Sequence, residues 1–388
     1  MRLAKKFLPI VALGLAGCLS TAEDGQIKPG HRPDLNSTEA GLWMVMDRFE
    51  RRLANSELVD RDPELNAYLN NLLCKVMPAH CQDIKLFVIK NPHFNASMAP
   101  NGSMHIWTGL LLRAQNEAQL ATVLGHEAAH YLNQHSLKKW EAAKATTDFL
   151  SFFSIATAGF GVGIVGLAAQ IGGLGSIQSY SRDMEHEADK VGFDLLYHAG
   201  FDPREAAKLW EQVKAEKEAS DDDTGSVFWS SHPPTEERIV KLKSMSRGKE
   251  TKFSVSNTTQ GSTFKRLRFS RWHDWADELI SSRRMAESLI VFDQLKENGF
   301  DPHEVSYFKG EVYRRRGDDG DLALALESYK EAAQITPAPL KTYKKMGLVY
   351  QRQQKTAEAI SHYETYLEQN PNAGDTAIVH TYIHQLRK

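Results

Sequence analysis

The sequence predicts a mainly α-helical protein with two parts, an α+β domain that carries a small sheet and a C-terminal α-solenoid. Three observations support this prediction. Apolar residues recur at helical spacing through stretches such as residues 64–77. Short apolar runs at residues 84–89 and 94–108 are typical of strands. The C-terminal part repeats itself with a period of 34 residues, as tandem helical hairpins do.

The composition is that of an ordinary globular protein. The 388 residues favour two or three domains, and a hydrophobic fraction of 41% is sufficient for a substantial core. The formal net charge is −2, so no basic excess points to nucleic acid as a partner.

The N-terminal residues resemble a bacterial lipoprotein signal. Basic residues precede an apolar run at residues 7–16, which is too short for a membrane span. Cys18 follows a small-residue cleavage site, so residues 1–17 are expected to be the signal peptide and Cys18 to be lipidated. The alternative is an ordinary signal peptide with an incidental cysteine. Residues 18–41 then form a polar tether to the membrane, and Leu19 favours the outer membrane, as in enterobacterial lipoproteins.

Two further cysteines, Cys74 and Cys81, stand close together in the sequence. In an oxidising periplasm such a pair is expected to form a disulfide that closes a short loop. The alternative is two buried free thiols. Metal binding by the pair is disfavoured, because no other cysteine stands nearby.

The first half of the chain is expected to contain two helices, a strand, a hairpin and a long helix, at residues 37–54, 64–77, 84–89, 94–108 and 117–140. The hairpin depends on Asn101-Gly102, a dipeptide typical of tight turns. The long helix is rich in Ala, Leu, Glu and Lys, and Gly125 is its only interruption. A strand beside this helix would be placed to hold an extended peptide by main-chain pairing.

The run from residue 149 to 181 contains no charged residue and is rich in glycine and alanine. Its length alone would allow a transmembrane helix, but the frequent glycines argue against one uninterrupted span. Short helices that cover a cleft or dip into a membrane surface are the preferred interpretation, and a true span is the alternative.

Three more helices, then a polar linker, are expected at residues 180–196, 206–217, 235–245 and 251–268. After the linker, three positions recur at the 34-residue period, Ala325, Tyr329 and Pro337 at Ala359, Tyr363 and Pro371. This period is typical of tetratricopeptide repeats, so residues 269–388 are expected to form a solenoid of three units, the first of them degenerate. The alternative is an unrelated helical bundle.

The motif with the clearest chemistry is His126-Glu127-x-x-His130, within the expected long helix. Residues four apart share a helix face, so His126 and His130 can bind one metal ion. Glu127 then lies beside the ion, in place for a general base that takes a proton from a water activated by the metal. The alternative is two surface histidines and a solvated glutamate.

A third metal ligand is expected from the helix at residues 180–196. Glu185 and Asp189 stand four apart and share a face, so Glu185 is assigned as the ligand. Asp189 is assigned as the carboxylate that orients a metal-bound histidine through its second ring nitrogen. Glu187 lies on another face and is expected to be solvated, and His186 to be solvated or locally hydrogen-bonded. The alternative is an exposed, charged helix.

Several motifs occur together in an order that resembles the gluzincin-type metallopeptidases related to HtpX and the CAAX prenyl proteases. They are Asn95-Ala96, Asn101-Gly102, Thr108-Gly109-Leu110, the H-E-x-x-H helix, Ser181-Arg182-x-x-Glu185-x-x-Ala188-Asp189, and His232-Pro233 through Arg238-Ile239. The resemblance marks residues 42–250 as the expected metallopeptidase domain. With a lipoprotein signal before it and repeats after it, the whole chain resembles the periplasmic BepA-like branch.

The resemblance implies one zinc ion held by His126, His130 and Glu185, with Glu127 as the base. It also implies a role in quality control and assembly of outer-membrane proteins. A lipid anchor differs from the cleavable signal of BepA.

Three further residues receive an interpretation. His232 either donates a hydrogen bond to the tetrahedral oxyanion or occupies the open position of zinc at rest and suppresses activity, and the second is preferred. The alternative is a histidine before a proline with no role. Arg238 is expected to pair with a carboxylate near the site. His135 is expected to face elsewhere, as an ordinary surface histidine.

The chain is therefore expected to be a lipid-anchored zinc endopeptidase of the periplasm that cleaves misfolded or stalled envelope proteins. Its repeats are expected to bind substrate or the outer-membrane assembly machinery. The alternative is a chaperone or adaptor for outer-membrane protein assembly whose zinc site is usually silent. A third possibility, a membrane-embedded protease, depends on residues 149–181 spanning the bilayer.

Overall fold

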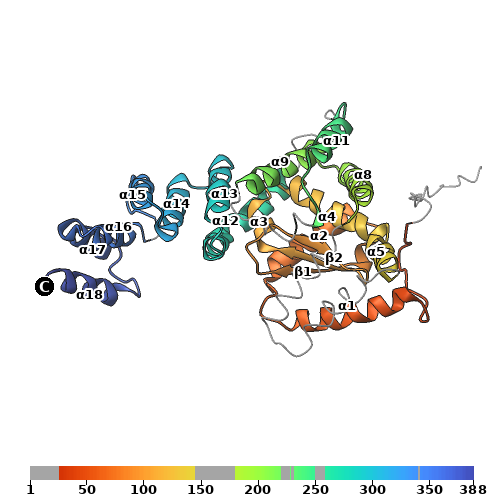
Figure 1. Ribbon diagram of the computed structural model, residues 1–388, viewed down its shortest axis with the longest axis horizontal. Helices are drawn as coiled ribbons and strands as arrows, with labels where there is room; N and C mark the ends of the chain where they lie inside the picture. The colour runs from red at the N-terminus through yellow and green to blue at the C-terminus, as the bar shows by residue number, and fades with distance from the viewer. Residues whose placement is uncertain (1–25, 145–179, 220–227, 229–230, 250–257, 340) are drawn as a thin grey trace, which may run out of the picture.

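The computed structural model of the chain describes residues 26–144, 180–219, 228, 231–249, 258–339 and 341–388. The expected signal peptide, Cys18 and nearly all of the uncharged run at residues 149–181 lie outside the described residues. Figure 1 shows a globular N-terminal part, from which a row of helices extends to the C-terminus. None of the helices in the described part of the chain has the length and apolar character that a bilayer crossing requires.

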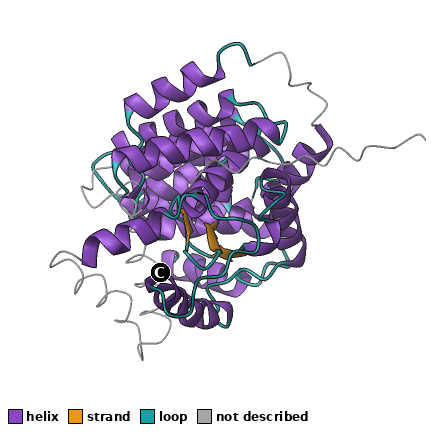
Figure 2. Cartoon of the chain, turned by 90° about the vertical axis from the view of Figure 1, so that its right-hand side faces the viewer, coloured by secondary structure: helices purple, strands orange, loops and turns teal. Residues whose placement is uncertain are grey.

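A small sheet lies among the helices of the N-terminal part (Figure 2). The strands are β1 (Lys85–Ile89), β2 (Ala96–Met98) and β3 (Ser103–Trp107), and the short 3₁₀ helix η1 (Cys81–Asp83) precedes them. The helices of this part are α1 (Thr38–Ala54), α2 (Pro63–Val76), α3 (Thr108–Arg113), α4 (Glu117–Leu132), α5 (His135–Lys144), α8 (Arg182–His198), α9 (Arg204–Glu218) and α11 (Glu236–Ser246).

The row of helices comprises α12 (Thr258–Ser281), α13 (Met285–Glu297), α14 (Pro302–Arg316), α15 (Asp321–Ala332), α16 (Thr342–Arg352), α17 (Thr356–Gln369) and α18 (Thr376–Leu386). The predicted mainly α fold with a small sheet and a helical C-terminal part is confirmed.

The sheet has the strand order β1-β3-β2, with β1 parallel and β2 antiparallel to β3. The predicted hairpin is present, because β2 and β3 pair across the turn that contains Asn101-Gly102. Gly102 has a φ of +86°, and a Cβ there would lie 2.2 Å from the carbonyl oxygen of Asp83. Only glycine fits this turn.

The strand order places β2 at an edge of the sheet, and α4 packs beside it.

Helices α4 and α8 cross with glycine against glycine. A Cβ on Gly192 of α8 would lie 2.8 Å from the backbone nitrogen of His126 and 3.0 Å from the carbonyl carbon of Gly125, both on α4. A side chain at this point would meet only backbone atoms, which cannot move aside as a flexible side chain can. The crossing therefore requires glycine, and it lies next to the H-E-x-x-H motif.

The single long helix predicted at residues 117–140 is wrong. Helix α4 ends at Leu132 and α5 begins at His135, and Gln134 between them has a φ of +52°. A right-handed helix cannot pass through a residue in this conformation, so α5 starts in a new direction. Neither glycine nor proline marks the break, which is why the helical pattern of the sequence conceals it.

The predicted tether at residues 18–41 is wrong for its described part. Ile27 is buried in the main hydrophobic core, and its backbone N–H donates to the carbonyl oxygen of Leu132 at 3.0 Å. Helix α1 already begins at Thr38. The chain is thus packed against the end of α4 from Ile27 onward rather than forming a free tether.

The structure joins Cys74, near the end of α2, to Cys81 in η1 through a disulfide, with the two Cα atoms 4.8 Å apart. The bond closes the loop between α2 and the first strand, as the spacing suggests.

The linker predicted at residues 251–268 is wrong from Thr258 onward, where α12 begins. Arg268 of this helix is buried, and its guanidinium donates to the carbonyl oxygens of Leu112 at 2.8 Å and Gln115 at 3.2 Å. These carbonyls lie near the end of α3, where backbone oxygens lack helical partners. Helix α12 therefore attaches the row of helices to the N-terminal part.

Two successive helix pairs in this row pack in the same way. Gly310 of α14 faces the ring of Tyr329 of α15, and Gly347 of α16 faces the ring of Tyr363 of α17. A Cβ on either glycine would lie 2.5 Å from a ring carbon of the tyrosine. The two tyrosines are separated by the 34-residue period of the sequence. The same contact in successive pairs is what stacked repeats require.

We expect Gly192→Ala to destabilise the fold and to weaken metal binding. The added methyl group meets backbone atoms of α4, so the helices must separate, at a cost of about 1–3 kcal/mol. The carboxylates of α8 would then lie farther from the histidines of α4. Thermal unfolding and metal titration measure the two effects. The control is Gly41→Ala in α1, where no atom lies within 4 Å of the new Cβ and stability should hold or rise. An unchanged Tm for Gly192→Ala would contradict this account of the crossing.

Candidate metal centre

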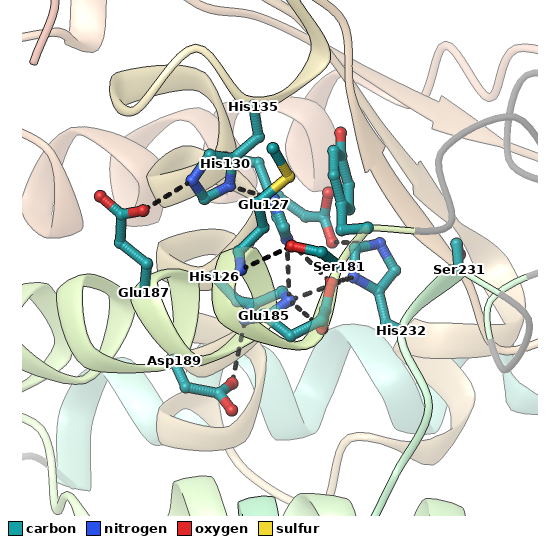
Figure 3. A network of polar contacts seen from close by, with 12 residues as sticks. His126, Glu127, His130, His135, Ser181, Glu185, Glu187, Asp189, Ser231 and His232 are labelled. Atoms are coloured by element: carbon teal, nitrogen blue, oxygen red, sulfur yellow. Dashed lines mark hydrogen bonds and ion pairs between the residues drawn. The ribbon is translucent and has the colours of Figure 1, made fainter. Parts of the chain in front are cut away.

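Four residues from three segments converge in the interior of the N-terminal part. His126 and His130 lie on α4, Glu185 lies on α8, and His232 lies on the segment before α11. One possible ligand atom from each residue lies within 4.8 Å of the others. Figure 3 shows the four side chains pointing toward one another. None of them is more than 3% exposed, so the cluster is shielded from bulk water.

Helix caps place two of the functional segments. The hydroxyl of Ser181 accepts a hydrogen bond from the backbone N–H of Met184. This cap starts α8 at Arg182, so Glu185 lies in the first turn of the helix. The hydroxyl of Thr235 accepts from the backbone N–H of Arg238 in the same way and starts α11. Both residues are of the type preferred at helix N-caps. The local sequence therefore fixes where each helix begins and which turn carries the site residue.

The donor atoms face a common point. Nε2 of His126 lies 3.2 Å from Nε2 of His130. The two carboxylate oxygens of Glu185 lie 3.5 Å and 3.4 Å from these nitrogens. Nδ1 of His232 lies 3.2 Å from Nε2 of His126 and 2.9 Å from Glu185. Imidazole nitrogens and a carboxylate are the ligands that zinc takes in proteins, so these residues fit a divalent metal ion of that kind.

A second layer of charged groups supports the cluster. Oδ1 of Asp189 lies 3.2 Å from Nδ1 of His126, on the side of the ring away from the cluster. The guanidinium of Arg238 donates two hydrogen bonds of 2.7 Å to Asp189 and lies 2.9 Å from Glu185. It also lies over the ring of Trp210, 4.2 Å from the centroid. The expected pairing of Arg238 with a carboxylate is thus present, with two carboxylates.

The buried charges shift one another's pKa values. Burial raises the pKa of Glu185, but the nearby histidines more than offset it and hold that pKa well below its usual range. Arg238 outweighs burial in the same way and lowers the pKa of Asp189. Burial disfavours a charged His126, yet its contacts with Asp189 and Glu185 prevail and raise its pKa to about 9. At His130 burial prevails, and the pKa is lowered.

Glu127 lies against the same cluster. It is 1% exposed, and within the described part of the chain its Oε1 has no hydrogen-bond partner. That oxygen lies 3.5 Å from Nε2 of His232. Burial raises the pKa of Glu127. A carboxylate with an uncommitted oxygen and a raised pKa is suited to accept a proton during a reaction.

A cavity of about 470 Å³ opens beside the cluster. Glu185 and Arg238 lie in its wall, together with Tyr180, His186 and Pro233. Glu185 belongs to both the cluster and the cavity wall, so the cavity reaches one residue of the cluster.

One sequence expectation for this region is wrong. His135 is not a surface histidine but is fully buried, and its Nδ1 lies 2.8 Å from Nδ1 of His130. Glu187 is solvent-exposed as expected, and its carboxylate also lies 3.1 Å from Nε2 of His135. The helix break after α4 is the feature that brings His135 back to the site. His186 contacts Glu237 at 3.1 Å, which agrees with a local hydrogen-bonding role.

Comparisons with known proteins agree with this geometry. The sequence profile of peptidase family M48 matches residues 55–246, a range that contains all four converging residues. The mitochondrial metalloendopeptidase OMA1 of Schizosaccharomyces pombe is 32% identical over 183 residues, 45% of this chain and 51% of the relative. The beta-barrel assembly-enhancing protease of Escherichia coli is 27% identical over 212 residues, 49% of this chain and 43% of the relative. The chain thus spans about half the length of the curated relatives it matches.

We expect Arg238→Met to destabilise the protein by about 3–5 kcal/mol, because two buried carboxylates would lose their shared cation. Chemical denaturation of the purified protein measures the change. Arg387→Met is the matched control, since Arg387 pairs with Glu364 at the surface and both side chains are exposed. That variant should lose less than about 1 kcal/mol. Equal losses in the two variants would show that the buried pairing does not support the cluster.

Proposed function

Because the sequence profile of peptidase family M48 matches residues 55–246, we propose that the chain is a zinc-dependent endopeptidase of the bacterial envelope. The observation that carries the proposal is the convergence of four buried donor residues beside Glu127. A helix pair held together by glycines supplies three of the donors, so the site is preorganised by the fold rather than by flexible loops.

In this proposal His126, His130 and Glu185 would hold the zinc ion. When bound, zinc polarises the scissile carbonyl and lowers the pKa of water. Glu127 accepts the proton of the attacking water and passes it to the leaving amine. Asp189 holds the ring of His126 from behind, and Arg238 holds Asp189 in turn.

His232 would restrain the enzyme at rest. Its imidazole lies inside the donor cluster, 2.9 Å from Glu185 and 3.2 Å from His126. A histidine there can act as a further metal ligand and fill the position that a substrate carbonyl needs. Its Nε2 also lies 3.5 Å from Glu127. The same ring, moved aside, would be within reach of an oxyanion, which is the second role considered for it.

We propose that the protein acts in the periplasm, anchored to a membrane by a lipid on Cys18. The basic and apolar pattern of residues 1–17 supports export. The Cys74–Cys81 disulfide fits an oxidising compartment. Leu19 after the cysteine favours the outer membrane.

The substrates would be misfolded or stalled envelope proteins. The name of the Escherichia coli relative, a beta-barrel assembly-enhancing protease, motivates this choice. Helices α12 to α18 would form tetratricopeptide repeats that bind substrate or the outer-membrane assembly machinery. The repeated glycine–tyrosine contacts between paired helices support that architecture. The proposed domains are residues 42–250 for the peptidase and residues 269–388 for the repeats.

A second candidate function is a chaperone or adaptor whose zinc site is usually silent. The position of His232 inside the cluster favours this candidate, because it obstructs the site. The intact base Glu127 favours the enzyme. Complementation of a deletion strain by the Glu127→Gln variant separates the two. Full rescue would favour the adaptor, because the variant lacks the proposed catalytic base, and loss of rescue would favour the enzyme.

We expect Glu127→Gln to retain zinc but to lose about 10²–10⁴-fold in cleavage rate, because the amide cannot accept the proton. Zinc content and casein cleavage are measured on the chain lacking residues 1–18. Glu141→Gln makes the same chemical change at an exposed position of α5 and should cleave like the parent. A Glu127→Gln variant of normal activity would refute the assigned base.

We expect His232→Ala to raise casein cleavage severalfold while one zinc per chain is retained, because the imidazole no longer competes for the metal. His198→Ala, an exposed histidine at the end of α8, is the matched control and should change neither quantity. Lower cleavage by His232→Ala with zinc retained would overturn the resting restraint and favour the oxyanion role.

A further inference from the structure

His135 occupies a position for which the proposed function has so far no use. It is the first residue of α5, and its side chain is completely buried. Its Nδ1 lies 2.8 Å from Nδ1 of His130, and its Nε2 lies 3.1 Å from Oε2 of Glu187. Figure 3 shows this chain of contacts on the side of His130 that faces away from the cluster.

We infer that His135 is a positioning residue that holds the ring of His130 and fixes its tautomer, so that Nε2 presents a lone pair to the metal. The inference rests on the proposed function, since it assigns His130 as a metal ligand.

The hydrogen-bonding requirements of the three groups support one arrangement. A carboxylate only accepts, so Nε2 of His135 carries the proton that is donated to Glu187. A neutral His135 then has a lone pair on Nδ1, which accepts from Nδ1–H of His130. That leaves the lone pair of His130 on Nε2, the atom 3.2 Å from Nε2 of His126 and 3.4 Å from Glu185. The opposite assignment would put a proton on the nitrogen that faces the cluster.

The two contacts of His135 differ in their exposure to water. The side chains of His130 and His135 are both fully buried, so the contact between them is shielded from solvent. Half of the Glu187 side chain is exposed.

The backbone provides the geometry. In a straight helix a residue five positions after His130 would lie about 140° away around the axis, given 3.6 residues per turn. The positive φ of Gln134 ends α4 and turns His135 back toward His130. Tyr180 stacks on the face of the His130 ring at 3.9 Å, and its hydroxyl lies 2.9 Å from that of Ser136. His130 is thus held at its edge and on its face.

The two proposed histidine ligands are oriented by different groups. His126 contacts Asp189, a carboxylate backed by Arg238, whereas His130 contacts a neutral imidazole. Metal-bound histidines in proteins commonly donate their second N–H to a carboxylate, carbonyl or water, and loss of such a partner costs about 10–100-fold in metal affinity.

The test measures zinc affinity of the full chain in detergent, by competition with a chromogenic chelator. His135→Leu should weaken zinc binding by about 10–100-fold. His135→Asn should bind within a few-fold of the parent, because its amide oxygen can accept from His130. His198→Leu, at an exposed position of α8, is the control and should not change affinity. The zinc-free Tm is measured for each variant to separate lost positioning from lost packing.

Each outcome bears on a different claim. Parent-like zinc affinity in His135→Leu overturns the positioning role and leaves the proposed function intact. Equal weakening in His135→Asn and His135→Leu overturns the acceptor role, because packing alone would explain it. A parent chain that binds no zinc defeats the proposed function itself.

If His135→Leu does not fold, ¹⁵N NMR of the zinc-bound parent decides. The inference requires a proton on Nδ1 of His130 and on Nε2 of His135, with Nδ1 of His135 unprotonated. A proton on Nδ1 of His135 would overturn it.

Discussion

The close crossing of α4 and α8 is the constraint on which the candidate site depends. Gly125 and Gly192 let the two backbones approach so closely that a Cβ on Gly192 would collide with backbone atoms of α4. Close to this contact, α4 carries the histidines of the H-E-x-x-H motif, and α8 carries Glu185 and Asp189, which meet those histidines. Strand β2, α9 and α2 also pack against α4.

Charge balance is the second constraint. Three carboxylates, Glu127, Glu185 and Asp189, are almost completely buried within one cluster, and Arg238 is the guanidinium that contacts two of them. Buried charges are costly unless they are paired. A divalent cation at the point where the imidazoles converge would balance the remaining negative charge. The same field raises the pKa of His126 to about 9, so protons compete with metal for this ring.

Local patterns in the sequence were sufficient for most of the fold and for the converging residues. The four-residue spacings in α4 and α8, the Asn101-Gly102 turn and the 34-residue period each describe one element and its near neighbours. The break at Gln134 was not predictable, because glutamine has no preference for a positive φ and the helical composition continues past it. His135 was misassigned for the same reason, and its contact with the exposed Glu187 was therefore missed. The start of α12 inside an apparently polar linker depends on tertiary contacts such as those of Arg268, which no local pattern contains.

The measurement that tests the central claim most directly is the X-ray absorption spectrum of the purified chain at the zinc edge, together with the zinc-to-protein ratio. The account requires one zinc per chain with nitrogen and oxygen ligands only, and the outer-shell scattering that imidazole rings produce. Absence of zinc, or a spectrum dominated by sulfur ligands, would contradict the assignment of His126, His130 and Glu185 as the metal site.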